Sequence, residues 1–126
     1  MKAALLVGIG GCVGALMRYG IHLGMLRLLP ASRVPMGTLV ANVVGCLLIG
    51  ILVQLLEGRD AMRLLLITGV LGSLTTFSTF GHDTVTLVKD HSLLHGLGHA
   101  ALTFVLGLGA VVVGMSLAKL LEKGVA

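Results

Sequence analysis

Residues 72–81 read GSLTTFSTFG and lie in the middle of an apolar segment that runs from about residue 62 to residue 88. Five of these ten residues carry hydroxyl groups, from which a straight helix facing lipid gains nothing. Gly, Ser and Thr at this density are typical of an interrupted membrane helix, because a break frees backbone amides and carbonyls to meet an ion. The stretch therefore predicts a membrane helix that is broken at its middle and a polar site at the break.

The composition of the whole chain indicates that lipid is its solvent. Of its 126 residues, 56% are hydrophobic and only 11% are charged, and the mean hydropathy is +1.08. A water-soluble domain of this size cannot bury so much apolar surface. A bilayer core about 30 Å thick needs roughly 20 apolar residues per helix. We predict a single all-α transmembrane domain over residues 1–126, with spans at about 3–29, 36–56, 62–88 and 97–121.

Polar or helix-breaking residues separate the predicted spans. Pro30 and Pro35 bracket the first loop, residues 57–60 form a tight polar turn, and residues 89–95 form the third connection. The first span is interpreted as a retained helix and not as a signal peptide, because no polar cleavage region follows it and further spans come after it.

The formal net charge of +4 comes from single basic residues at the ends of the spans, with no aromatic residues between them. This pattern predicts interfacial anchors and no nucleic-acid partner. On the side of the two termini lie Lys2, Arg59, Arg63, Lys119 and Lys123, and on the other side lie Arg27, Arg33 and Lys89. Because Lys and Arg set membrane orientation, this weak bias predicts insertion in both directions, which permits two copies to pair antiparallel.

Small residues recur at helix-packing spacing along three spans. They are Gly10 and Gly14 on the first, Gly37, Ala41 and Gly45 on the second, and Ala110, Gly114 and Ala118 on the fourth. Such stripes let helix backbones approach closely, so we expect them to hold the four helices together.

Polar side chains at membrane depth are costly to bury and therefore mark candidate functional residues. Thr38 and Asn42 lie one turn apart on the second span, and the Asn42 amide offers two donors and an acceptor. From the residues alone, Asn42 either joins helices or belongs to a site. Arg18, beside Tyr19, lies deep in the first span, where it needs Asp83 or freed carbonyls as a partner unless it extends to the interface.

The broken span itself offers two kinds of binding group. Carbonyls freed at Gly72 and Thr75 suit a hard cation, whereas hydroxyl and amide groups suit an anion. Phe77 and Phe80 share a helix face at i, i+3 spacing. The edge of an aromatic ring is positive, so two rings presented edge-on help to solvate a small anion. Core packing is the alternative explanation for this pair.

The histidines and cysteines give weaker signals. His91, His95 and His99 follow one another at i, i+4 spacing, as the ligands of a metal on a helix do, but no Cys or carboxylate completes the set. We therefore favour ordinary interfacial side chains. Cys12 and Cys46 lie in apolar, Gly-rich stretches, where a thiol behaves as a small hydrophobe.

Three motifs that cover almost the whole chain resemble the bacterial fluoride channels called Fluc or CrcB. Residues 10–19 read GGCVGALMRY, residues 35–45 read PMGTLVANVVG, and residues 75–80 read TTFSTF. The third motif is highly specific, whereas the glycine patterns alone are weak.

The resemblance implies a dual-topology antiparallel homodimer in the bacterial inner membrane. It further implies two fluoride pores, a structural sodium ion at the centre of the interface, and passive, selective fluoride efflux that protects the cell. By this resemblance, Phe77 and Phe80 line the pores and Asn42 donates to the ion, while Gly72 and Thr75 offer carbonyls to the sodium. The remaining implied roles are a polar path at Thr38, Ser78 and Thr79, and a vestibule at Arg18.

Four features depart from the family's usual pattern. Ser73, Asp83 and Ala41 are mild departures. In the fourth span, residues 107–112 read GLGAVV where relatives carry Asn, His or Ser, and the nearest hydroxyl, on Thr103, comes at least one turn early. Either the alignment shifts through the connection that precedes the span, or the pore wall is less polar, or the chain pairs with a different subunit.

The alternative from another class is a small multidrug-type antiporter, which exchanges protons for cationic drugs. Such a carrier needs a carboxylate in the membrane, whereas the first span here carries Arg18 and no acid, and the chain has no Trp for a drug pocket. No enzyme is expected, because His82 and Asp83 are the only acid and base near the cluster and no nucleophile is placed with them. The residues do not distinguish a channel from a carrier.

Overall fold

The computed structural model describes residues 1–125. Four spans follow one another: α1 (Lys2–Leu28), α2 (Met36–Leu55), a compound third span, and α6 (Leu93–Val125). The third span consists of α3 (Asp60–Met62), the π-helical segment η1 (Arg63–Leu71), α4 (Gly72–Leu74) and α5 (Phe77–Asp90). All four are long and apolar enough to cross a bilayer, and no strand occurs within residues 1–125. The predicted all-α membrane fold with four spans is confirmed.

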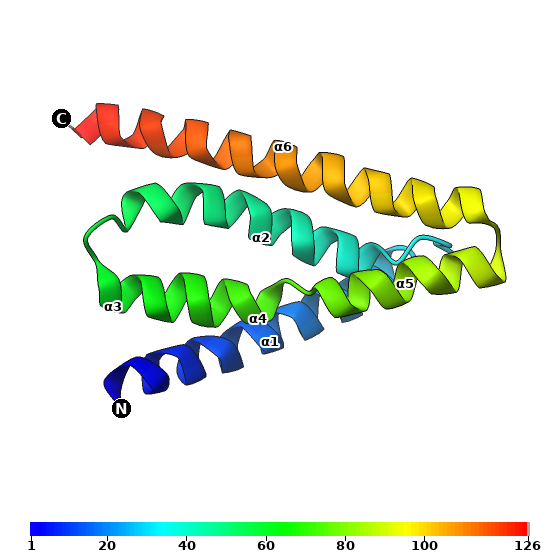
Figure 1. Cartoon of the computed structure of the whole chain (residues 1–126), viewed down its shortest axis with the longest axis horizontal. Helices are drawn as coiled ribbons and strands as arrows, with labels where there is room; N and C mark the ends of the chain where they lie inside the picture. Colours follow the sequence, from blue (N-terminus) through cyan, green and yellow to red (C-terminus); the bar gives the residue numbers. More distant parts are fainter. Residues whose placement is uncertain (126) are drawn as a thin grey trace.

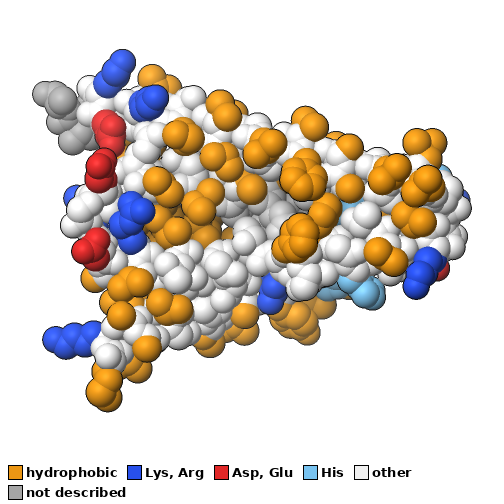
Figure 2. Space-filling model, viewed as in Figure 1, with side chains coloured by type: hydrophobic (Ala, Val, Ile, Leu, Met, Phe, Trp, Pro, Cys, Tyr) orange, Lys and Arg blue, Asp and Glu red, His pale blue; other side chains and the backbone are white. Residues whose placement is uncertain are grey.

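The spans lie roughly side by side along the long axis of the molecule (Figure 1). The beginning of α1, the end of α6 and the turn between α2 and α3 lie at one end, whereas the α1–α2 loop and the α5–α6 turn lie at the other. Charged side chains gather mostly at the end that holds the termini, while apolar side chains are spread over the middle (Figure 2). This distribution is expected of a bundle whose middle lies in lipid.

The helix boundaries differ most from the prediction in the fourth span. It begins at Leu93 instead of about residue 97, and the expected connection at 89–95 shrinks to His91 and Ser92. Ser92 caps the helix: its Oγ accepts from the N–H of His95 at 3.4 Å, and its carbonyl accepts from the N–H of Gly96 at 3.2 Å. Serine is a preferred N-cap residue, so a polar run that reads as a loop here starts a helix.

Close backbone contacts at glycines hold the spans together. α1 packs on η1 at Gly10 and Gly14, and a Cβ added at Gly14 would overlap the Val70 carbonyl. α2 packs on α6 at Gly50 and Gly114, where a Cβ at either position would overlap a backbone carbonyl of the other helix. These contacts seat α1 against the first half of the third span and α6 against α2.

The buried interior is small and lies beside the break. Its centre is formed by Ala41 of α2 with Leu71 and Leu74 of the third span, and Ile21 of α1 packs against them. Leu74 is fully buried and is the last helical residue before the chain becomes extended. The core therefore anchors the end of α4, directly before the break.

Candidate ion site at the broken helix

The break in the third span consists of two extended threonines. Thr75 has φ −83° and ψ 155°, and Thr76 has φ −153° and ψ 120°. Of the two residues that the sequence places at the break, Gly72 still lies in a helical turn, whereas Thr75 is extended. Threonine is stiff at χ1 and is well suited to extended backbone, which explains this position. The predicted interruption of the third span is therefore present, at Thr75 and Thr76.

The four carbonyl groups of residues 72–75 lose their α-helical partners at the break, and those of Gly72 and Thr75 are the two that the sequence predicts to be offered to a cation. In a continuous helix, the Gly72 carbonyl would accept from the N–H of Thr76, and the Thr75 carbonyl from the N–H of Thr79. The Thr76 N–H instead donates to Asn42 Oδ1 at 2.9 Å, and the Thr79 N–H donates to Thr76 Oγ1 at 3.2 Å. Gly72 and Thr75 also line one cavity of about 230 Å³ between α2 and the third span. Oxygen ligands of this kind fit a small hard cation.

Asn42 joins α2 to the break through both ends of its amide. Its Oδ1 accepts from the Thr76 N–H, and its Nδ2 donates to the Thr76 carbonyl at 3.4 Å. The amide nitrogen carries two hydrogens, and the second has no partner within residues 1–125. Asn42 thus performs the structural role considered for it and keeps one donor for a ligand.

A cavity of about 310 Å³ opens between α2, the break, α5 and α6. We call it the aromatic cavity, and its lining consists of Asn42, Cys46, Thr75, Thr76, Phe77, Phe80, Thr103, Phe104, Gly107, Leu108 and Val111. Phe77 and Phe80 lie with ring centroids 5.8 Å apart, as expected of one helix face. Phe104 of α6, which the sequence reasoning missed, lies edge-on to Phe80 with centroids 6.0 Å apart.

A second cavity, of about 290 Å³, lies on the α1 side of the break. We call it the Arg18 cavity, and it is lined by Ala15, Arg18, Tyr19, His22, Gly37, Thr38, Thr76 and Thr79. Thr76 lines both this cavity and the aromatic cavity. Its Oγ1 lies 3.1 Å from the hydroxyl of Ser78 and 3.2 Å from that of Thr79. Three hydroxyl groups therefore cluster where the two cavities meet.

Arg18 has neither a hydrogen bond nor an ion pair with another side chain within residues 1–125, although Asp83 or freed carbonyls were the expected partners. Asp83 instead accepts from the Thr38 hydroxyl, with Oγ1 and Oδ2 2.6 Å apart, and lies 3.6 Å from the His82 ring. The guanidinium charge of Arg18 therefore remains available to an anion in the Arg18 cavity.

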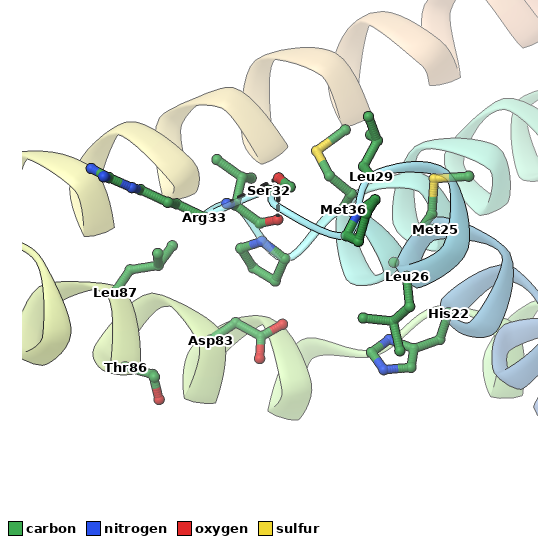
Figure 3. A pocket seen from close by; sticks show the side chains of 14 residues that line it. His22, Met25, Leu26, Leu29, Ser32, Arg33, Met36, Asp83, Thr86 and Leu87 are labelled. Atoms are coloured by element: carbon green, nitrogen blue, oxygen red, sulfur yellow. Dashed lines mark hydrogen bonds between the residues drawn. The ribbon is translucent and has the colours of Figure 1, made fainter.

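Asp83 also lines a third cavity, of about 260 Å³, beneath the α1–α2 loop. Figure 3 shows His22 of α1 and Asp83 of α5 approaching this hollow from different sides, while the side chain of Arg33 runs away from them. The third cavity shares His22 and Gly37 with the Arg18 cavity. Neighbouring cavities with shared walls thus extend from the loop to the break and on to the aromatic cavity.

Comparison with known proteins places this architecture in a family. Residues 5–115 match the family described as CrcB-like protein, Camphor Resistance (CrcB). The chain belongs to the CrcB family. The resemblance of its three motifs to that family is thereby confirmed.

Curated CrcB relatives extend over nearly the whole chain. A protein of Chloroflexus aurantiacus is 37% identical over 123 residues, which cover 94% of this chain and 97% of the relative. A protein of Paracoccus denitrificans is 40% identical, with coverage of 91% and 93%, and one of Desulfotalea psychrophila is 43% identical, with coverage of 86% and 85%. All three are named fluoride-specific ion channel FluC.

The fourth span is where this sequence departs most from the usual CrcB pattern, because it lacks the expected polar groups. The side of the aromatic cavity that α6 forms, here called the α6 wall, shows what takes their place. Thr103 does line the aromatic cavity, but its hydroxyl donates to the His99 carbonyl at 2.9 Å. His99 is only 3% exposed and packs on Phe80 with ring centroids 5.8 Å apart. Neither ring nitrogen of His99 has a hydrogen-bond partner within residues 1–125.

The three histidines considered as a metal face do not come together. His91 and His95 have ring centroids 5.6 Å apart, and His95 Nδ1 lies 2.7 Å from Ser92 Oγ. His99 is buried against Phe80 instead. Within residues 1–125, no group of three or more His, Cys, Asp or Glu side chains is arranged to hold a metal ion.

Proposed function

We propose that this CrcB-family protein is a fluoride-specific channel that lets fluoride leave the cytoplasm passively and so protects the cell from it. The relatives that span nearly its whole length carry that name. The observation that carries the proposal is the aromatic cavity, which aromatic rings and the Asn42 amide line within the spans without a charged side chain. A site built from dipoles binds a small anion yet lets it go, as conduction requires.

On this proposal, an anion follows a polar path beside the break. Arg18 attracts it into the Arg18 cavity, where the hydroxyls of Thr38, Ser78 and Thr79 lie in or beside the wall. Thr76 connects this cavity to the aromatic cavity, where the second N–H of Asn42 and the edges of Phe77 and Phe80 replace water around the ion. All the residues of this path except Thr76 are those that the family resemblance implies.

We further propose that the functional unit is an antiparallel pair of copies in the bacterial inner membrane. Phe77 is 80% exposed in the single chain, and the aromatic cavity that it lines is open. A second copy against this side would enclose the cavity. The near balance of basic residues at the two ends supports insertion in both directions. A topology reporter at the C-terminus should read both sides of the membrane, and a reporter that reads one side only would contradict this arrangement.

A sodium ion bound by the carbonyls of Gly72 and Thr75 is proposed as the structural cofactor. Both carbonyls have lost their helical partners, and both residues line one cavity, so the donor set fits a hard cation. Purification with a bulky organic cation in place of sodium should lower the stability of the pair or its fluoride flux. Indifference to sodium would remove the cation from the proposal.

The decisive experiment on function is an efflux assay. The purified protein is reconstituted in liposomes loaded with fluoride, and external fluoride is followed with an ion-selective electrode, with chloride-loaded liposomes as the control. We expect fast fluoride efflux and far slower, though measurable, chloride efflux. Absence of fluoride efflux, or equal efflux of chloride, would end the channel proposal, and efflux that requires a proton gradient would favour a carrier.

A further inference from the structure

All the phenylalanines of this chain lie around one cavity. The sequence contains three, and Phe77, Phe80 and Phe104 all line the aromatic cavity. The first two come from α5, whereas Phe104 comes from α6, which otherwise presents aliphatic, hydroxyl and glycine residues to this space. The family resemblance assigns no role to Phe104. Its position raises the question of what a third ring contributes.

The contact between Phe80 and Phe104 is a perpendicular one. Their ring planes meet at 83° with centroids 6.0 Å apart, whereas Phe77 and Phe80 are only tilted by 43°. In a perpendicular pair, the positive edge of one ring meets the negative face of the other. Phe80 and Phe104 therefore meet edge to face, and both rings line the aromatic cavity.

The α6 wall offers no other positive group to an anion. The hydroxyl hydrogen of Thr103 is already donated to the His99 carbonyl. Gly107, Leu108 and Val111, the other α6 residues of the wall, have no polar side chain. Phe104 is 59% exposed, so its ring is not enclosed in the core of the chain. The ring edge of Phe104 is thus the one positive feature that an α6 side chain can turn toward the aromatic cavity.

We propose that Phe104 is a third anion-facing aromatic residue, which supplies the α6 wall of the fluoride path with a ring edge in place of the polar groups that this helix lacks, and which thereby sets selectivity for fluoride over larger anions. The inference rests on the proposed channel function. It explains how a CrcB protein with a glycine and aliphatic residues at this wall retains a surface that solvates an anion.

The test compares variants in the liposome assay, with fluoride and chloride efflux measured separately. Phe104→Leu removes the ring, and Phe104→Tyr keeps it. Leu106→Ala on the same helix removes as many carbon atoms as Phe104→Leu, from a residue outside the cavity wall, and is the matched control. We expect Phe104→Leu to lower the ratio of fluoride to chloride efflux by roughly three- to tenfold, the scale of one aromatic contact. In Phe104→Tyr and Leu106→Ala, the ratio of fluoride to chloride efflux should stay within about twofold of the wild-type ratio.

A second variant separates the ring edge from the packing of the ring. Pentafluorophenylalanine, incorporated at position 104, keeps nearly the same shape but makes the ring edge negative. If the ring edge of residue 104 faces the anion, this variant loses fluoride efflux at least as strongly as Phe104→Leu. Because the substituted ring keeps its shape, the variant remains informative even where Phe104→Leu fails to fold. Wild-type selectivity with pentafluorophenylalanine would overturn the inference. A wild-type protein that carries no fluoride would instead overturn the proposed function itself.

Discussion

The Arg18 cavity and the aromatic cavity meet at Thr76, yet they are built from different chemistry. The first offers a full positive charge together with hydroxyl groups, and the second offers aromatic rings and one amide hydrogen. A full charge attracts an anion over several ångströms, whereas partial charges act only at contact. On the proposed function, attraction of the anion would therefore belong to the Arg18 cavity and selective passage to the aromatic cavity.

The largest expected effect comes from the centre of the aromatic cavity. Phe80 contacts Phe77, His99 and Phe104, so Phe80→Ile removes the ring on which the whole cluster depends. We expect fluoride efflux from liposomes to fall by at least about tenfold, equivalent to ~1.4 kcal/mol at the barrier, with the protein still folded. Phe77→Ile should act in the same direction with a smaller loss. Wild-type efflux from both variants would move the pore out of the aromatic cavity.

The next largest effect is expected at the bridge between Asn42 and Thr76, the residue that lines both cavities. Asn42→Ala leaves the N–H and carbonyl of Thr76 without the amide that now pairs with both. We expect the free energy of unfolding in detergent to fall by about 1–3 kcal/mol, and fluoride efflux to fall with it. Gln54→Ala removes an amide from the same helix at a position without side-chain hydrogen bonds within residues 1–125, so it is the control. Equal losses from both variants would mean that the bridge to Thr76 adds nothing.

An effect on stability alone is expected at the contact where α1, which carries Arg18, rests on η1. A Cβ at Gly14 would overlap the Val70 carbonyl, whereas a Cβ at Gly8 meets nothing. We expect Gly14→Ala to lower the free energy of unfolding by about 1–3 kcal/mol, because the helices must separate. Gly8→Ala should leave it unchanged or raise it by up to ~1 kcal/mol through helix propensity. Thermal melting of the two variants decides, and similar melting curves would show that this close contact is not needed.

The smallest effect is expected at the far end of the Arg18 cavity. Thr38→Val removes the hydroxyl that donates to Asp83 at 2.6 Å, while Thr38→Ser retains a donor. We expect a loss of fluoride efflux of roughly two- to fivefold in the valine variant and recovery in the serine variant. Identical efflux from the two would indicate that the Thr38–Asp83 contact is structural only, and would confine the ion path to the break and the aromatic cavity.

Much of the site was predictable from local pattern. The hydroxyl run at 72–81 predicted the interruption, and i, i+3 spacing predicted that Phe77 and Phe80 share a face. The start of the fourth span was less predictable. Ser92 reads as part of a loop and in fact caps α6. The partner of a backbone group decided this outcome, and that partner is not visible in the spacing of residue types.

Hydropathy and motif spacing were enough to predict the membrane fold, the number of spans and the family, because both are properties of consecutive residues. Tertiary structure alone decided which groups meet at the break. Asn42 takes the Thr76 N–H across 34 positions, and Phe104 reaches Phe80 from another helix. Contacts of this kind depend on how each helix is rotated and where it crosses its neighbour, which close glycine packing sets and which hydropathy does not encode.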